Sequence, residues 1–244
     1  MIFVTSDWHF SHDREFVYKP RGFNSVEEMN IALVERHNSI VTPEDDVYVL
    51  GDLCLGGTDS LERNKEFISS MNGKLHIAFG NHCTDSRKKM YAELPNVVET
   101  AWAIALKYRK YHFYMSHFPT LTGNLEKESL KQMIINLYGH THQQTNFFED
   151  RPYMYHVGVD SHDCYPVSLD KVIEDAEIQA EQALIKAQAE ADALEIAAQA
   201  EAEANSKIAA SLTPELIEKI KYEQWNGQMP STMTGTDSSI LITP

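Results

Sequence analysis

The sequence lacks several features that would place it in a special class of proteins. It has no uncharged apolar run of the ~18 to 20 residues that a membrane-spanning helix needs. Its first residues, MIFVTSDWHF, are too short an apolar stretch and turn acidic too soon for a secretory signal peptide. It has only three cysteines, without metal-site spacing, so we expect free thiols rather than a disulfide framework. We therefore expect a cytoplasmic protein without a membrane span.

Positive charge is scarce. The chain has 21 Lys and Arg against 36 Asp and Glu, a formal net charge of −15. An average field of this sign repels polyanions, which argues against long nucleic acid as a partner. Small anionic substrates, drawn in by bound cations, remain compatible with this composition. Hydrophobic residues make up 43% of the 244 positions, which is enough for a substantial core.

Glycine and proline are absent from residues 171–212, where Ala, Glu and Gln dominate. This composition predicts one long helix. Before it, apolar strand-like runs alternate with segments of helical periodicity, which predicts an α/β domain over residues 1–170. After it, residues 213–244 are expected to form a short helix and a mostly disordered tail. The expected strands are 2–6, 46–52, 74–81, 101–108, 111–117, 133–140 and 153–160, and the expected helices are 25–40 and 59–71, with Ser25 and Asp59 as N-caps.

Five of the expected strands end in polar residues. The segments are SDWH at 6–9, GD at 51–52, GNH at 80–82, SH at 116–117 and GHTH at 139–142. Because the carboxyl ends of neighbouring strands meet at one edge of an open α/β sheet, we expect these side chains to share a crevice. Their mixture of Asp, Asn and His suits Mn, Fe, Zn or Ni better than Mg. The pattern predicts a metal site with more ligands than one ion needs.

Each of these residues has an ordinary structural explanation when it is taken alone. His117 could be a surface or core histidine, Asp52 a helix N-cap, and Asn81 a turn residue beside Gly80. The hypothesis depends on their conjunction, each after an apolar run. The other histidines lack this context and are expected to be structural or exposed: His12, His37, His76, His112, His156 and His162.

The ordered motifs DWH, GDL, GNH, SHFP and GHTH resemble those of the calcineurin-like metallophosphoesterase superfamily over residues 1–170. Residues 25–53 resemble the small single-domain bacterial and phage members. The resemblance implies a two-layer β-sandwich flanked by helices, with two divalent metal ions at one edge. Manganese is the first expectation for these ions, and iron, zinc or nickel are alternatives. Carried over motif by motif, the resemblance implies that Asp7, His9 and His142 hold one ion, that Asn81, His117 and His140 hold the other, and that Asp52 bridges both.

This resemblance implies an enzyme that hydrolyses a small, nucleotide-like phosphodiester or phosphomonoester. A hydroxide bridging two ions ~3.5 to 4 Å apart would attack phosphorus, and His82 would stabilise the transition state or protonate the leaving oxygen. The family commonly has an acidic residue after GNH, but Cys83 stands there and a thiol is a weak acceptor. Either Asp85 takes its role or His82 is less basic. Arg14 and Arg21 follow the first motif and could bind substrate oxygens bidentately or be exposed loop cations.

The C-terminal part, about 175–235, resembles the C-terminal end of prohibitin and stomatin-type proteins, most clearly in SLTPELIEKIKYEQWNGQMP, where Gln228 replaces the usual lysine. This implies self-association into a homo-oligomer, although a solvated helix explains the composition equally well. The heptad pattern is weak, because its positions are Leu184, Ala191, Ala198, Asn205 and Leu212. Two function classes remain: an active binuclear phosphoesterase, and a catalytically weak scaffold of the same fold that self-associates or binds partners through the helix.

Overall fold

The computed structural model describes residues 1–57, 60–127, 129–223, 232–234 and 240–242. The chain divides into two compact units, Met1–Ile185 and Lys186–Pro244. No helix within these described ranges combines the length and the apolar character that crossing a bilayer requires.

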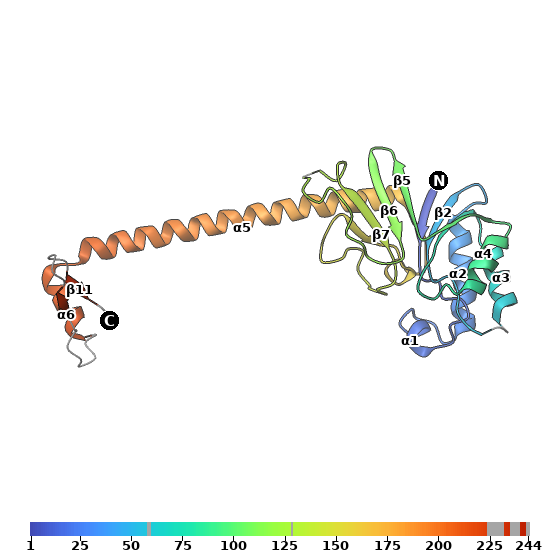
Figure 1. Ribbon diagram of the computed structural model, residues 1–244, viewed down its shortest axis with the longest axis horizontal. Helices are drawn as coiled ribbons and strands as arrows, with labels where there is room; N and C mark the ends of the chain where they lie inside the picture. The colour runs from blue at the N-terminus through green and yellow to red at the C-terminus, as the bar shows by residue number, and fades with distance from the viewer. Residues whose placement is uncertain (58–59, 128, 224–231, 235–239, 243–244) are drawn as a thin grey trace. The chain divides into compact units, whose positions relative to one another are not determined.

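The first unit contains two sheets (Figure 1). The five-stranded sheet has the order β4-β3-β2-β1-β9, in which β9 alone runs antiparallel to its neighbour. Its strands are β1 (Ile2–Thr5), β2 (Asp46–Leu50), β3 (Lys74–Ala78), β4 (Val97–Ala101) and β9 (Val167–Ser168). The sequence did not indicate β4 or β9, because β4 is partly exposed without an apolar run and β9 has only two residues.

The four-stranded sheet has the order β5-β6-β7-β8. Strands β5 and β6 form an antiparallel hairpin, and β6, β7 and β8 run parallel. The strands are β5 (Ala103–Tyr108), β6 (Tyr111–Ser116), β7 (Ile134–Tyr138) and β8 (Met154–His156). The carboxyl ends of four parallel strands in the first sheet and three in the second are therefore available to carry functional loops.

The helices of this unit connect the strands: α1 (Glu15–Tyr18), α2 (Val26–Ile40), α3 (Leu61–Ser69), α4 (Asp85–Glu93) and the 3-10 turn Val159–Ser161. Ser25 caps α2 as expected, since its side chain accepts a hydrogen bond from the Glu28 amide at 3.1 Å. The proposed cap Asp59 lies outside the described residues, and Ser60 precedes α3. Helices α1 and α4 were not expected from the sequence, because α1 has only four residues and the first five residues of α4 are all polar.

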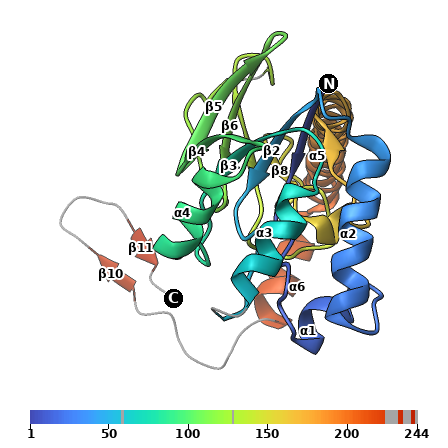
Figure 2. The ribbon, with the colours of Figure 1, turned by 90° about the vertical axis from the view of Figure 1, so that its right-hand side faces the viewer.

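The core has two parts, one on each face of the five-stranded sheet. Phe3 and Val49 point to one face, where they pack with α2, α3 and α4. Their neighbours Val4 and Leu50 point to the other face and pack against the second sheet. This alternation follows from the two-residue period of a strand. Figure 2 shows the helices outside the sheet pair, so the predicted α/β fold of two sheets flanked by helices is confirmed.

The long helix is also confirmed. Helix α5 (Leu169–Ser211) begins with Leu169, Val172, Ile173 and Ala176 buried in the first unit, whereas residues 181–211 are exposed. The second unit continues with α6 (Pro214–Glu223) and an antiparallel pair, β10 (Thr232–Thr234) and β11 (Ile240–Ile242). The expected disordered tail falls largely on residues outside the described part, 224–231, 235–239 and 243–244.

Candidate metal centre

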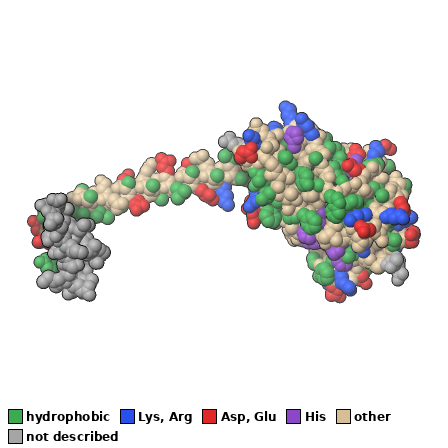
Figure 3. Space-filling model, viewed as in Figure 1, with side chains coloured by type: hydrophobic (Ala, Val, Ile, Leu, Met, Phe, Trp, Pro, Cys, Tyr) green, Lys and Arg blue, Asp and Glu red, His purple; other side chains and the backbone are tan. Residues whose placement is uncertain are grey.

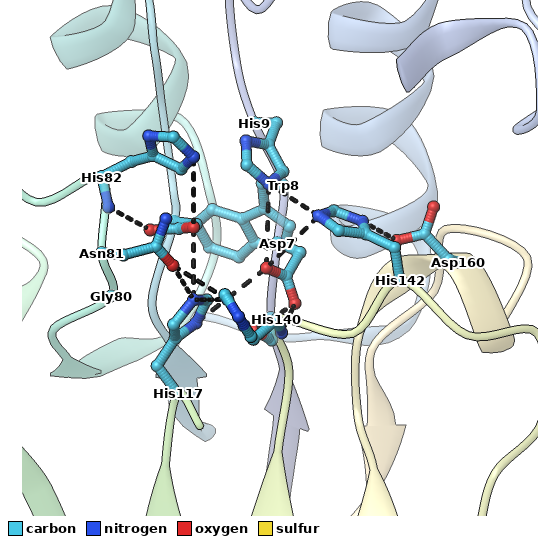
Figure 4. Close-up of polar contacts among 12 residues, drawn as sticks. Asp7, Trp8, His9, Gly80, Asn81, His82, His117, His140, His142 and Asp160 are labelled. Atoms are coloured by element: carbon cyan, nitrogen blue, oxygen red, sulfur yellow. Dashed lines mark hydrogen bonds and ion pairs between the residues drawn. The ribbon is translucent and has the colours of Figure 1, made fainter. Parts of the chain in front are cut away.

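The polar loops that follow β1, β2, β3, β6 and β7 meet at one edge of the sheet pair (Figure 4). The structure brings together all seven residues that the sequence proposed as metal ligands. Six of these seven side chains form two groups. The first ligand group is Asp7, His9 and His142, and the second ligand group is Asn81, His117 and His140.

The first ligand group surrounds a free carboxylate oxygen. His9 Nε2 and His142 Nε2 lie 3.2 Å apart, and Asp7 Oδ1 lies 3.7 Å from the former and 4.0 Å from the latter. The other oxygen, Asp7 Oδ2, accepts hydrogen bonds from Ser6 Oγ at 2.7 Å and from the His140 amide at 2.9 Å. Asp7 Oδ1 is buried and has no hydrogen-bond partner among the described residues. An uncompensated buried carboxylate oxygen beside two imidazoles fits a cation.

In the second ligand group, several lone pairs point at one another. His117 Nδ1 lies 2.8 Å from the Leu50 carbonyl, to which it donates a hydrogen bond. In the neutral ring Nε2 is then an acceptor. Yet Nε2 lies 2.8 Å from Asn81 Oδ1 and 3.2 Å from His140 Nδ1. Asp52 Oδ2 also lies 3.2 Å from it. A divalent ion among these atoms would use the lone pairs that otherwise face each other.

Within the part of the chain that the structure describes, two sets of side chains are close enough to hold an ion: Asp7, His9 and His142, and Asp7, Asp52 and His117. Asp7 belongs to both. The family resemblance implies that Asp52 is the bridging ligand, whereas in this structure Asp7 is shared by the two sets and Asp52 belongs to one of them. The donor atoms, carboxylate oxygens with imidazole nitrogens, suit first-row transition metals.

The backbone at this edge is strained. Non-glycine residues rarely have positive φ, yet φ is 59° at Asp7, 54° at His9, 51° at Asp52, 67° at His140 and 49° at His142. Each such residue costs on the order of 1 kcal/mol or more, and such residues concentrate at functional sites. Five of the seven proposed ligands adopt this conformation, which turns successive side chains toward one point.

The electrostatics also favour a cation. Burial raises the pKa of Asp7, but His9, His117 and His142 outweigh it, so its pKa lies well below the ordinary range. Burial likewise raises the pKa of Asp52, yet contact with His117 leaves the net pKa lowered. Both carboxylates are therefore ionised at neutral pH although each is at most 2% exposed. Buried negative charge of this kind needs a counterion.

Comparison with known proteins places the chain in a family. No family model matches it. It is 30% identical over 179 residues to the uncharacterized protein MJ1445 of Methanocaldococcus jannaschii, which covers 71% of this chain and 89% of that protein. The chain belongs to the MJ1445 family. A second relative is the Gene 66 protein of Mycobacterium phage D29, 26% identical over 198 residues, which covers 72% of this chain and 97% of that protein.

Solved structures add a likeness in fold. The protein of unknown function AQ665 from Aquifex aeolicus aligns with a TM-score of 0.56 and 19% identity over 71% of this chain and 98% of that chain. At this identity the likeness shows the fold alone. An archaeal phosphodiesterase aligns with a TM-score of 0.36 and 14% identity, which is too low to support any argument about this MJ1445-family protein.

Asp160 belongs to the site although the sequence reasoning missed it. Its Oδ2 accepts a hydrogen bond from His142 Nδ1 at 2.8 Å, which leaves the His142 Nε2 lone pair directed toward His9 and Asp7. Carboxylate and imidazole pairs of this kind fix the tautomer of metal-binding histidines in other proteins. The signal was present, because Asp160 ends the expected strand 153–160 just as the other polar tips end theirs.

His82 lies beside the two ligand groups rather than within them. Its amide donates to Asp52 Oδ1 at 2.9 Å, and its ring Nε2 lies 4.0 Å from Asp52 Oδ2. Cys83 is buried and its sulfur accepts the Gly80 amide at 3.2 Å, so it supports the turn. The alternative that Asp85 orients His82 is wrong, because the Asp85 side chain is fully exposed and faces Lys88 at 3.4 Å.

Of the two arginines proposed as substrate contacts, Arg21 is buried and engaged elsewhere, and Arg14 is exposed. The Arg21 side chain is 1% exposed. It donates from Nε to Asp160 Oδ1 at 2.8 Å and from its terminal nitrogens to the carbonyls of Asp7 and Trp8. Arg21 thus holds the first loop to Asp160. Arg14 lies at the N-terminus of α1 and donates to the Asp13 carbonyl at 3.5 Å.

Proposed function

We propose that this protein is a calcineurin-like metallophosphoesterase, a hydrolase that uses divalent metal ions to cleave a small phosphodiester or phosphomonoester. The observation that carries the proposal is the convergence of buried lone pairs: Asp7 Oδ1 has no hydrogen-bond partner within the described part of the chain, and His117 Nε2 faces Asn81 Oδ1 and His140 Nδ1. This donor set, on the carboxyl ends of parallel strands, matches the ordered motifs of that superfamily.

The first ligand group would hold one ion and the second ligand group another, with Asp52 between them. Such an ion pair, manganese in our proposal, would neutralise phosphate oxygens and lower the pKa of a bound water. The protein itself orients the histidine ligands. Asp160 fixes the tautomer of His142, and the Leu50 carbonyl fixes that of His117.

His82 is the group placed to act on the leaving oxygen. Its side chain is 40% exposed and lines the cavity beside the ligand groups. An imidazole at that position can donate a proton to the departing oxygen, a contribution of about 10²- to 10⁴-fold in rate. Because Asp85 points away and Cys83 serves the turn, no carboxylate other than Asp52 lies within 4.0 Å of the His82 ring nitrogens among the described residues.

The proposal is tested with manganese-loaded protein and two chromogenic esters, bis(p-nitrophenyl) phosphate and p-nitrophenyl phosphate. We expect metal-dependent turnover of at least one ester, its loss in Asp52→Asn, and a reduction of about 10²-fold or more in His82→Ala. His112→Ala, which removes an exposed histidine on β6, is the matched control. Turnover of neither ester, or full turnover by Asp52→Asn, would refute the proposal.

A second proposal concerns the C-terminal helix, which we propose mediates association between copies of this chain. Its large apolar side chains are exposed: Leu184 is 70%, Leu194 73% and Ile196 67% exposed. These exposed side chains support the proposal, because contact with a second copy would remove apolar surface from water. Self-association is compatible with catalysis, and it is also the role that this helix would have in the scaffold alternative.

A further inference from the structure

A cavity of about 440 Å³ opens beside the first ligand group, within the first unit. One wall is polar and includes His9, His82 and His142, and the other is formed by α1 and its flanking loop, with Phe16, Val17, Pro20 and His12. On the side of the molecule where Figure 1 places α1, histidine and hydrophobic surfaces adjoin in Figure 3. The volume falls in the range of about 300 to 1,000 Å³ that holds small molecules and is too small for a polymer.

The wall opposite the ligand groups is apolar and carries an unusual exposed ring. Phe16 is 72% exposed, and its ring meets that of His12 edge-on, with centroids 5.7 Å apart. Glu15 and Lys19, the charged residues on either side of Phe16, form an ion pair at 2.7 Å, so their charges neutralise each other. This wall therefore offers aromatic and apolar surface without net charge.

Among the described residues that line the same cavity, none is Lys or Arg. Arg21 is buried behind the ligand groups, where Asp160 and two carbonyls use its donors. The cavity thus has no side chain built to hold a second phosphate, which removes the basis for a diphosphate or oligonucleotide substrate.

We propose that this cavity binds the organic group of the phosphate ester, and that Phe16 stacks on a planar, uncharged ring such as a nucleobase or an aryl group. Gln144, at the rim, supplies an amide for hydrogen bonds to that ring. The inference rests on the proposed function, because the phosphate itself would lie at the ligand groups. It narrows the substrate class to esters with one phosphate and one aromatic or heteroaromatic group.

Binding of two phosphonates tests this without relying on turnover. Phenylphosphonate and methylphosphonate both have a carbon–phosphorus bond that an esterase does not cleave, and they differ only in the ring. Their dissociation constants are measured by isothermal titration calorimetry on the full-length, manganese-loaded protein. We expect phenylphosphonate to bind more tightly than methylphosphonate. In Phe16→Ala the ratio of the two affinities should fall by on the order of 10- to 100-fold, because stacking on an aromatic side chain is worth about that much per base.

Two further variants complete the experiment. Phe16→Tyr keeps the ring and should keep the affinity ratio of the wild type. Trp102→Ala removes an aromatic side chain that is 65% exposed and meets the Phe79 ring edge-on outside the cavity, so it should also keep the ratio. A wild-type ratio near one, or a ratio that Phe16→Ala leaves intact, would overturn the inference while leaving the phosphate site standing. Failure of the wild type to bind either phosphonate would overturn the proposed function as well.

Discussion

Gly139, the residue before the two histidines of GHTH, provides the sharpest test of how the ligand groups are built. A Cβ atom at this position would lie 1.9 Å from Ser6 Oγ and 2.2 Å from Asp7 Oδ2. Contacts this short are impossible, so Gly139→Ala must displace either the loop after β7 or the loop after β1. The atoms in the way are the two partners of the hydrogen bond that Ser6 donates to Asp7 at 2.7 Å.

The size of the effect follows from the bonds that would break. Asp7 Oδ2 accepts from Ser6 Oγ and from the His140 amide, and hydrogen bonds to a charged group contribute about 1.5 to 3 kcal/mol each. Losing both would lower the free energy of unfolding by about 3 to 6 kcal/mol. The same shift would move Asp7 and His140 away from their ligand groups, so manganese affinity should fall together with stability.

Urea denaturation and calorimetric titration with manganese measure the two effects. The matched control is Gly57→Ala, because Gly57 is exposed and a Cβ there meets nothing within 4 Å. The control should unfold within about 0.5 kcal/mol of the wild type, as surface substitutions usually do. If Gly139→Ala also unfolds within 1 kcal/mol of the wild type and binds manganese with the same affinity, the packing argument for this edge is incorrect.

Three other predictions concern separate parts of the molecule. Asp160→Asn should weaken manganese binding by about 10- to 100-fold, because His142 loses the carboxylate that fixes its tautomer; unchanged affinity by calorimetry would show that Asp160 does not orient His142. His37 is fully buried and donates to the Asn72 carbonyl, and burial lowers its pKa to about 4. The folded-state pKa of His37 lies below its unfolded value near 6.5, so its contribution to the free energy of unfolding is complete above pH 6.5 and falls by about 3 kcal/mol as the pH drops to 4. Between pH 7 and pH 4, His37→Gln should therefore lose less stability than the wild type by about this amount. An equal loss of stability in both proteins would exclude His37 as its source. Finally, the full-length chain should sediment as an oligomer that Leu194→Lys with Ile196→Lys reduces toward the monomer; a wild-type monomer would remove the proposed role of α5.

Much of the fold was readable because its signals are local. The apolar runs that became β1, β2, β3 and β5 to β8 lie in the core, and the alanine- and glutamate-rich segment forms α5. Strand β4 was missed because its residues Val98 and Glu99 are exposed and its place depends on pairing with β3. Helix α1 was missed because four residues show no period. Its position matters most, since it carries Phe16 to the cavity.

The candidate site was readable for a different reason. Each proposed ligand follows an apolar run, and the topology of parallel strands places such tips at one edge. What the sequence could not reveal was the set of partners reached across the fold. Asp160 pairs with Arg21 over 139 positions of the chain, and this buried ion pair gives Arg21 a structural role where the sequence left a substrate contact and an exposed loop cation open. Likewise, only the packing reveals that the Asp85 side chain faces solvent and that the Cys83 sulfur accepts a hydrogen bond within the turn at Gly80.

We propose that the loops after five strands hold two metal ions side by side, one in each ligand group. Anomalous diffraction from crystals soaked in manganese would locate these ions. We expect two peaks about 3.5 to 4 Å apart, one beside Asp7 Oδ1 and one beside His117 Nε2. A single peak, or no peak within reach of these atoms, would contradict this proposal.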